Sequence, residues 1–163
     1  MILRIVLDAN IWVYALLRKD PFFRLLQHAY SHPPLVMLII DSYCAIEVLH
    51  VLRRLPRSSS ISQESLERAF WSILNSTSCL LDFEFPLAKD LITKLRNKTE
   101  FLMIAHIFQI EAKDVPYLVL SFKHNVPLIT ADYRSIYLKR DNINSKLGIE
   151  ILSITEALER LNA

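Results

Sequence analysis

The chain has 163 residues, of which 52% are hydrophobic, with a formal net charge of +2 and a single glycine. This length fits one domain over residues 1–163, and the lone glycine excludes the glycine-rich loops that bind dinucleotides or nucleoside triphosphates. The longest apolar runs are far shorter than the roughly 18 residues that a membrane helix needs. Arg4 and Asp8 interrupt the apolar N-terminus, unlike a secretion signal, so we expect a cytoplasmic protein with no membrane association.

Apolar runs rich in β-branched residues predict strands, and apolar residues at helical spacing predict helices between them. In chain order we expect a strand over residues 2–7, helices over 9–18 and 22–30, a strand over 35–40, a helix from about 42 to 55, a helix over 62–75, a strand over 79–83, one or two helices over 87–110, a helix over about 114–124, a strand over 126–130, a short helix over 133–139, a strand over 149–152 and a last helix to 161.

Strands that alternate with helices are typical of an α/β protein with a mostly parallel sheet. The strand over 35–40 is apolar throughout, as expected when helices cover both faces of a sheet. We therefore predict a three-layer α/β/α sandwich around a mostly parallel five-stranded sheet. Ser153 and Glu156 predict a capping box at the last helix. The helices between the second and third strands can form a hairpin with its exposed tip at residues 56–60.

Four acidic residues stand where such a sheet would bring them to one edge. Asp8 ends the first strand, and Asp132 follows the fourth strand by two residues. Asp114 begins the helix that leads into the fourth strand, and Glu47 lies about two turns into the helix after the second strand. Ligand sites of parallel sheets form outside the carboxyl ends of the strands. We therefore expect these acids to converge, although each alone also fits a helix cap, a turn or an exposed helix position.

A cluster of carboxylates is electrostatically unfavourable without a bound cation, because like charges oppose each other's ionisation. Oxygen ligands favour Mg²⁺ or Mn²⁺ over zinc. Such an ion can activate water and stabilise the displacement at a phosphodiester. The acidic residues therefore predict metal-dependent hydrolysis of a nucleic acid.

The chain resembles the PIN domain family, metal-dependent nucleases best known as the toxins of bacterial and archaeal toxin–antitoxin pairs. The resemblance rests on LDAN at residues 7–10, a glutamate in the helix after the second strand, DVPYLVLS at 114–121 and LITAD at 128–132. These motifs follow one another in the order of the family and cover essentially the whole chain. Family members often carry a further acid two residues after the last aspartate, where this chain has Arg134.

The resemblance implies a PIN-like fold and an endoribonuclease in which Asp8, Glu47, Asp114 and Asp132 are the catalytic residues that ligate Mg²⁺ or Mn²⁺. Asn10 and Thr130 match polar positions that support the acids. The substrate would be RNA, a toxin member would be held inactive by an antitoxin protein, and a homodimer is expected.

Three basic residues near the predicted hairpin tip are candidates for binding RNA phosphates or are simply solvated: Arg53, Arg54 and Arg57. An alternative function for the whole chain is a catalytically inactive PIN-like module that binds RNA or a protein. A response-regulator receiver is disfavoured, because LDAN and the last strand supply neither the acid pair nor the lysine that its phosphoryl transfer needs.

Overall fold

The computed structural model describes residues 1–56 and 61–162. Within these residues the chain forms one five-stranded sheet in the order β3-β2-β1-β4-β5, with every neighbouring pair of strands parallel. The strands are β1 (Leu3–Leu7), β2 (Val36–Asp41), β3 (Cys79–Asp82), β4 (Leu128–Ile129) and β5 (Ile151–Leu152). The predicted parallel sheet is therefore confirmed.

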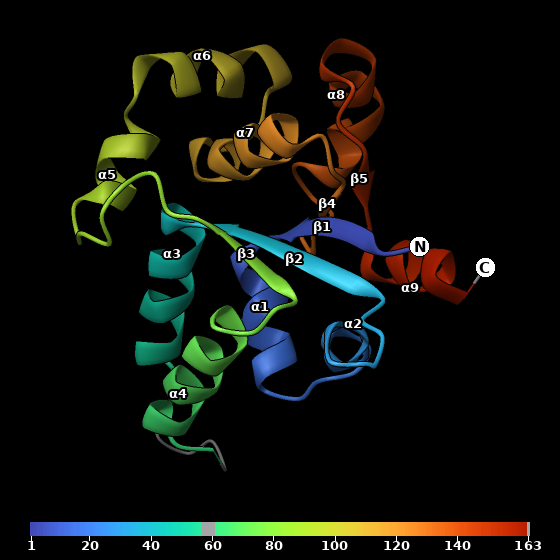
Figure 1. Ribbon diagram of the computed structural model, residues 1–163. Coiled ribbons are helices and arrows are strands. Elements are labelled where there is room, and N and C mark those ends of the chain that lie inside the picture. Colours follow the sequence, from blue (N-terminus) through green and yellow to red (C-terminus); the bar gives the residue numbers. More distant parts are fainter. Residues whose placement is uncertain (57–60, 163) are drawn as a thin grey trace.

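Helices cover both faces of the sheet (Figure 1). One group, drawn below the sheet, consists of α1 (Ala9–Leu16), α2 (Phe22–Ala29), α3 (Ser42–Arg53), α4 (Gln63–Leu74) and α9 (Ile154–Asn162). The other group, drawn above it, consists of α5 (Leu91–Arg96), α6 (Thr99–Phe108), α7 (Val115–His124) and α8 (Arg140–Leu147). This arrangement confirms the predicted three-layer α/β/α sandwich.

Strand β1 lies in the middle of the sheet, between β2 and β4. Its residues Ile5, Val6 and Leu7 are almost completely buried, because helices cover both faces of the strand. Each such side chain contributes about 1.5–3 kcal/mol of burial free energy. The buried strand therefore fixes the backbone position of Asp8, the residue that follows it.

The strand order reverses between β1 and β4. From β1 the chain proceeds to β2 and then to β3 at one edge, and the next strand, β4, pairs with the opposite side of β1. Leu7 at the end of β1 is the register partner of Ile129 at the end of β4. In open parallel sheets, ligands bind outside the carboxyl ends of the strands at such a reversal.

The long helical region predicted over residues 87–110 is two helices, α5 and α6. They are separated at Asn97 and Lys98, where Lys98 has extended backbone with φ −64° and ψ 128°. An extended residue cannot continue the helical hydrogen-bond ladder. The break turns the chain, so that α5 contacts α3 while α6 contacts α7.

The short helix predicted over residues 133–139 is confirmed only in its last part, where Tyr137–Lys139 form a 3₁₀ helix, and residues 133–136 form a turn. Oδ1 of Asp132 accepts the amide hydrogens of Arg134 at 3.2 Å and Ser135 at 3.0 Å, which favours a turn there. A 3₁₀ turn, η2 (Tyr137–Lys139), and the helix α8 follow. Only Ile143 is buried within α8, so this helix lacks the apolar periodicity that reveals helices in a sequence.

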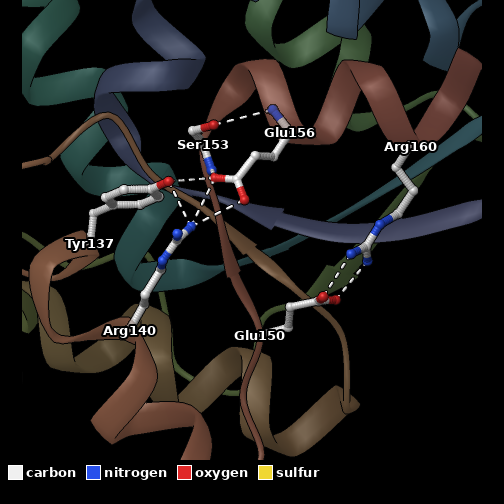
Figure 2. Close-up of polar contacts among 6 residues, drawn as sticks. All are labelled: Tyr137, Arg140, Glu150, Ser153, Glu156 and Arg160. Atoms are coloured by element: carbon white, nitrogen blue, oxygen red, sulfur yellow. Dashed lines mark hydrogen bonds and ion pairs between the residues drawn. The ribbon is translucent and has the colours of Figure 1, made fainter.

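The end of the chain follows its predicted local signals. Gly148 ends α8 with φ +69°, a left-handed conformation that favours glycine. The capping box is confirmed, because the Glu156 amide donates to Ser153 Oγ and the Ser153 amide donates to Glu156 Oε1, both at 3.1 Å (Figure 2). Most of the predicted hairpin tip, residues 57–60, lies outside the described residues. In the described part of the chain, no helix is long and apolar enough to cross a membrane.

Candidate active site

The acids predicted from the sequence line one cleft at the carboxyl ends of the strands. The cleft has a volume of about 250 Å³. Asp8 follows β1, Glu47 lies in α3, Asp114 precedes α7 and Asp132 follows β4. Asn10, in the first turn of α1, also lines this cleft. Four separate segments of the sequence thus contribute carboxylates to the same space.

Hydrogen bonds hold the carboxylate of Asp8 between the ends of β1 and β4. Its Oδ1 accepts from the amide of Ile11 at 3.0 Å, which caps the start of α1. Its Oδ2 accepts from the Thr130 hydroxyl at 2.8 Å and the Ala131 amide at 3.0 Å. Burial raises the pKa of Asp8, and these hydrogen bonds to the charged form oppose that rise. The orientation of this carboxylate is therefore fixed.

Thr130 connects Asp8 to Asp132. The buried Thr130 hydroxyl donates to Asp8 Oδ2 and accepts the amide hydrogen of Asp132 at 2.9 Å. Asp132 in turn accepts amide hydrogens only through Oδ1 among the described residues. The backbone that carries Asp132 is thus tied to the first acid through one hydroxyl group.

Asp114 lies at the end of a 3₁₀ turn, η1 (Ala112–Asp114), directly before α7. Its Oδ2 is buried and has no hydrogen-bond partner among the described residues. Loss of hydration, and then the charge of Asp132, raise the pKa of Asp114 from 3.8 to about 7, while the charge of Lys113 opposes this rise. An unpartnered carboxylate oxygen near other carboxylates is a costly arrangement that a cation would stabilise.

Glu47 is engaged by two side chains from outside α3. Its Oε2 accepts a hydrogen bond from the hydroxyl of Tyr117 in α7. Its Oε1 forms an ion pair with Nη2 of Arg96 in α5 at 3.0 Å. Burial raises the pKa of Glu47, and the Tyr117 hydrogen bond and the Arg96 charge oppose that rise. Glu47 therefore differs from Asp114, because its negative charge already has partners.

The residues of this cleft fit a hard divalent cation. In the described part of the chain, no three Asp, Glu, His or Cys side chains stand close enough together to hold one ion by themselves. Mg²⁺ does not need such a cage, because it commonly keeps several waters and binds through one or two carboxylates. The carboxylate oxygens that line the cleft, including the unpartnered oxygen of Asp114, match that requirement. Among the described residues, Oδ2 of Asp114 has no partner and Asp132 accepts hydrogen bonds only through Oδ1. Asp8 and Glu47 could hold the ion only by sharing carboxylate oxygens that already accept hydrogen bonds.

The structure adds two cationic residues to the cleft that the sequence analysis did not single out, Arg96 and Lys113. Lys113 is next to Asp114 in the sequence, so its position could have been noted. Arg96 lies 49 residues from Glu47, and nothing in the local pattern of α5 distinguishes it from the other basic residues there. Tyr117 belongs to the DVPY segment, but its hydrogen bond to Glu47 could not be read from the sequence.

Of the basic residues predicted near the hairpin tip, Arg53 and Arg54 are described, and neither lines the cleft. Nε of Arg53 pairs with Oε1 of Glu67 in α4 at 2.8 Å. Arg54 is exposed at the carboxyl end of α3. Arg57 lies outside the described residues.

A larger hollow of about 420 Å³ lies at the amino ends of β4 and β5, on the opposite side of the sheet from the carboxyl ends of the strands. Its lining includes Ser121, Asn125 and Glu150. The Glu150 carboxylate forms an ion pair with Arg160 at 2.6 Å and is therefore already neutralised. The smaller, acidic cleft is the better candidate for chemistry.

A parallel sheet with acidic residues at its strand-order reversal defines an α/β protein with a candidate ligand site at that reversal, and comparison with known proteins identifies its family. The chain belongs to the PIN domain family, whose model, described as PIN domain, matches residues 5–142. Proteins of this family are generally nucleases. This match confirms the resemblance that the sequence motifs indicated.

Two solved structures share the fold. One is VapBC2 from Rickettsia felis bound to a DNA fragment from their promoter, with 13% identity, a TM-score of 0.54, and coverage of 93% of this chain and 98% of that chain. The other is FitAB bound to an IR36 DNA fragment, with 15% identity, a TM-score of 0.53, and coverage of 92% and 94%. Similarity at these identities concerns the fold. A sequence search found no match among curated proteins.

Proposed function

We propose that this PIN domain is an endoribonuclease that depends on Mg²⁺ or Mn²⁺. Asp8, Glu47, Asp114 and Asp132 are the proposed catalytic residues and metal ligands, bound directly or through water. Membership of a family that generally consists of nucleases supports the reaction class. The gathering of these acids in one cleft supports its location.

The observation that carries the proposal is the electrostatic state of Asp114. Its buried Oδ2 has no partner among the described residues, and its pKa of about 7 reflects loss of hydration and the nearby charge of Asp132. A bound divalent ion would remove both sources of instability at once. When bound, the ion would supply Lewis-acid activation of water and neutralise charge at the phosphodiester.

Hydrogen bonds within the protein orient the carboxylates that this reaction needs. Hydrolysis adds water across one P–O bond, so that one product end keeps the phosphate and the other gains a hydroxyl. The hydrogen bonds of Asp8 from Ile11 and Thr130 keep its carboxylate in a single orientation. Asn10 contributes a neutral amide to the same cleft. Thr130 contacts the acids rather than the cleft and is therefore a supporting residue.

The proposed partners follow from the family resemblance. RNA is the proposed substrate, with Arg53, Arg54 and Arg57 as further phosphate contacts, of which Arg57 lies outside the described residues. Arg53 pairs with Glu67 through Nε, so the remaining donors of its exposed guanidinium could contact a phosphate. We also propose that the protein forms a homodimer and that an antitoxin protein inhibits it. The architecture shared with VapBC2 and FitAB supports looking for such a partner.

The test is cleavage of a mixed pool of single-stranded RNA with Mn²⁺ present. The protein should cleave the pool, and Asp8→Asn and Asp132→Asn should each lower the rate by at least about 100-fold, the range typical for loss of a catalytic electrostatic group. Glu159→Gln, which removes an exposed acid in α9, is the matched control and should retain the full rate.

Activity that survives in both asparagine variants would exclude this site. If Mn²⁺ binds to the wild-type protein but no RNA is cleaved, the alternative function is favoured, a PIN-like module that binds RNA or a protein without catalysis. Purified variants should be compared by their unfolding midpoints, so that a loss of rate is not confused with a loss of folded protein.

A further inference from the structure

Arg96 brings a positive charge into a cleft dominated by carboxylates. It extends from the last turn of α5 and lines the cleft together with Asp8, Asp114 and Asp132. About 38% of its side chain is exposed. The guanidinium is therefore accessible to a molecule that enters the cleft, although it also contacts the protein.

The position of this guanidinium is fixed by Tyr43 and Glu47. Nε of Arg96 donates to the Tyr43 hydroxyl at 3.0 Å, and Nη2 donates to Glu47 Oε1 at 3.0 Å. The guanidinium also lies over the Tyr43 ring, with its carbon 6.0 Å from the ring centroid. The Tyr43 hydroxyl in turn donates to the backbone carbonyl of Lys113 at 2.9 Å. One buried tyrosine thus connects α3, α5 and the segment that carries Asp114.

These contacts leave most of the hydrogen-bonding capacity of Arg96 unused. A guanidinium has five N–H donors in a rigid planar fork. Among the described residues, only Tyr43 and Glu47 accept hydrogen bonds from it. The remaining donors of this fixed, partly exposed group can bind a planar or tetrahedral oxyanion.

We propose that Arg96 binds a phosphate of the RNA strand beside the acidic cleft, as a residue that positions the substrate. This inference rests on the proposed nuclease function, because it assumes that the cleft receives RNA. The phosphate backbone is anionic and would otherwise approach four carboxylates that line the same cleft. A fixed arginine next to them reduces that repulsion and sets the distance between the strand and the acids.

A purely structural role for Arg96 would be to neutralise Glu47, and the two roles predict different binding behaviour. A phosphate contact releases counterions from the nucleic acid, so its loss changes the salt dependence of binding. If Arg96 served only to neutralise Glu47, then Arg96 would not be needed for binding once Glu47 is replaced by a neutral residue. Binding can be measured without catalysis, which separates this question from the activity of the metal-loaded protein.

The experiment measures the affinity for a fluorescein-labelled single-stranded oligoribonucleotide of mixed sequence by fluorescence anisotropy in EDTA. KCl is varied from about 50 to about 200 mM. The proteins compared are the wild type, Arg96→Gln, Arg96→Lys, and the double variant Glu47→Gln/Arg96→Gln. Lys94→Gln is the matched control, because Lys94 carries the same charge on the same helix but pairs with Asp90 at 3.1 Å.

For Arg96→Gln we expect about tenfold weaker binding at low salt. The logarithm of the association constant should also fall less steeply with log [KCl], with a slope whose magnitude is reduced by about 0.7, the value for one phosphate contact on a single strand. Arg96→Lys should retain the slope with part of the affinity lost. The double variant should keep the reduced slope of Arg96→Gln even if the loss of the Glu47 charge restores some affinity. Lys94→Gln should bind as the wild type does.

An unchanged slope in Arg96→Gln, or recovery of the wild-type slope in the double variant, would overturn the inference and leave the proposed function intact. Equal effects of Lys94→Gln and Arg96→Gln would also overturn it, because they would indicate a general effect of charge on α5. If the wild type neither binds this RNA in EDTA nor cleaves the RNA pool with Mn²⁺, the proposed function fails together with the inference.

Discussion

The Thr130 hydroxyl donates a hydrogen bond to Oδ2 of Asp8 at 2.8 Å, and this contact joins the end of β4 to the end of β1. The two residues lie 122 positions apart in the sequence. Both are buried, so the hydrogen bond is shielded from water and the loss of either partner would leave a buried polar group without its contact.

Thr130→Val tests this contact with little change in side-chain shape. We expect the free energy of unfolding to fall by about 1–3 kcal/mol, measured by urea denaturation, and the rate of RNA cleavage to fall about tenfold because Asp8 is held less firmly. Thr130→Ser, which keeps the hydroxyl, should recover most of both losses. A valine variant with wild-type stability and rate would contradict this account.

The raised pKa of Asp114 predicts how the stability of the metal-free protein changes with pH. The pKa is about 7 in the folded protein and 3.8 ordinarily, so between these values the folded state binds the proton more tightly than the unfolded chain does. The charged carboxylate therefore destabilises the fold above about pH 7, and this destabilisation is relieved as the pH falls toward about 4.

We expect the free energy of unfolding to rise when the pH is lowered from about 8 to about 5 in EDTA, and to change less in Asp114→Asn. At about pH 8 this variant should be more stable than the wild type by about 2 kcal/mol, roughly half of what the pKa difference alone implies, because the carboxyl group is partly exposed to solvent. Asp41, whose burial raises its pKa to about 6, acts in the same direction and leaves part of the slope. A pH dependence identical in both proteins would refute the role of Asp114.

Metal binding should change the thermal stability of the protein through the same carboxylate. Because a ligand that binds only the folded state stabilises it, Mn²⁺ should raise the unfolding midpoint of the wild type, and EDTA should reverse this effect. In Asp114→Asn the rise should be smaller, whereas Glu159→Gln should behave as the wild type does. Differential scanning fluorimetry measures these midpoints, and an equal rise in Asp114→Asn would place the ion elsewhere.

The contacts of Glu156 stabilise the region around α9 (Figure 2). Oε1 of Glu156 pairs with Nη1 of Arg140 at 3.0 Å and accepts the Tyr137 hydroxyl at 2.5 Å. Burial tends to raise the pKa of Glu156, but its hydrogen bonds from Tyr137 and Ser153 and the Arg140 charge exceed that effect and hold it at about 2. The stabilisation is therefore present above the ordinary pKa of 4.5 and is lost as the pH falls from there toward 2.

Glu156→Gln should lower the free energy of unfolding at neutral pH by about 1 kcal/mol, a value discounted for the solvent exposure of the pair. The difference from the wild type should disappear near pH 2. Glu150→Gln, which removes the exposed pair with Arg160, is the control and should cost no more than about 0.5 kcal/mol. Equal losses in the two variants would show that the additional contacts of Glu156 add no stability.

The features that could be predicted from the sequence are those with a local signal. The apolar runs that contain Ile5 and Ile39 revealed buried strands, and their order among helices indicated the parallel sheet. The acids Asp8 and Asp132 could be assigned to one edge because Asp8 directly follows a strand and Asp132 follows another by two residues. Asp114 and Glu47 could be assigned to the same edge because they lie in helices that connect the strands, and the family motifs then agreed with all four positions.

The features that could not be predicted depend on contacts between distant segments or on weak local patterns. Arg96 reaches Glu47 across 49 positions, and its role depends on how the chain turns between α5 and α6. Helix α8 is mostly polar, with Ile143 as its buried residue, so its sequence has no apolar periodicity that would predict a helix. The unpartnered oxygen of Asp114 is a property of packing and has no signature in the sequence.

The hydrogen bond between Thr130 and Asp8 affects when the cleft can form during synthesis of the chain. Since ribosomes make the N-terminus first, Asp8 emerges long before the residue 122 positions later that fixes its carboxylate. The acidic cleft also needs Asp132, so a nascent chain cannot assemble it until most of the chain has been translated. The proposed nuclease would therefore be inactive until the segment that carries Thr130 and Asp132 has been translated.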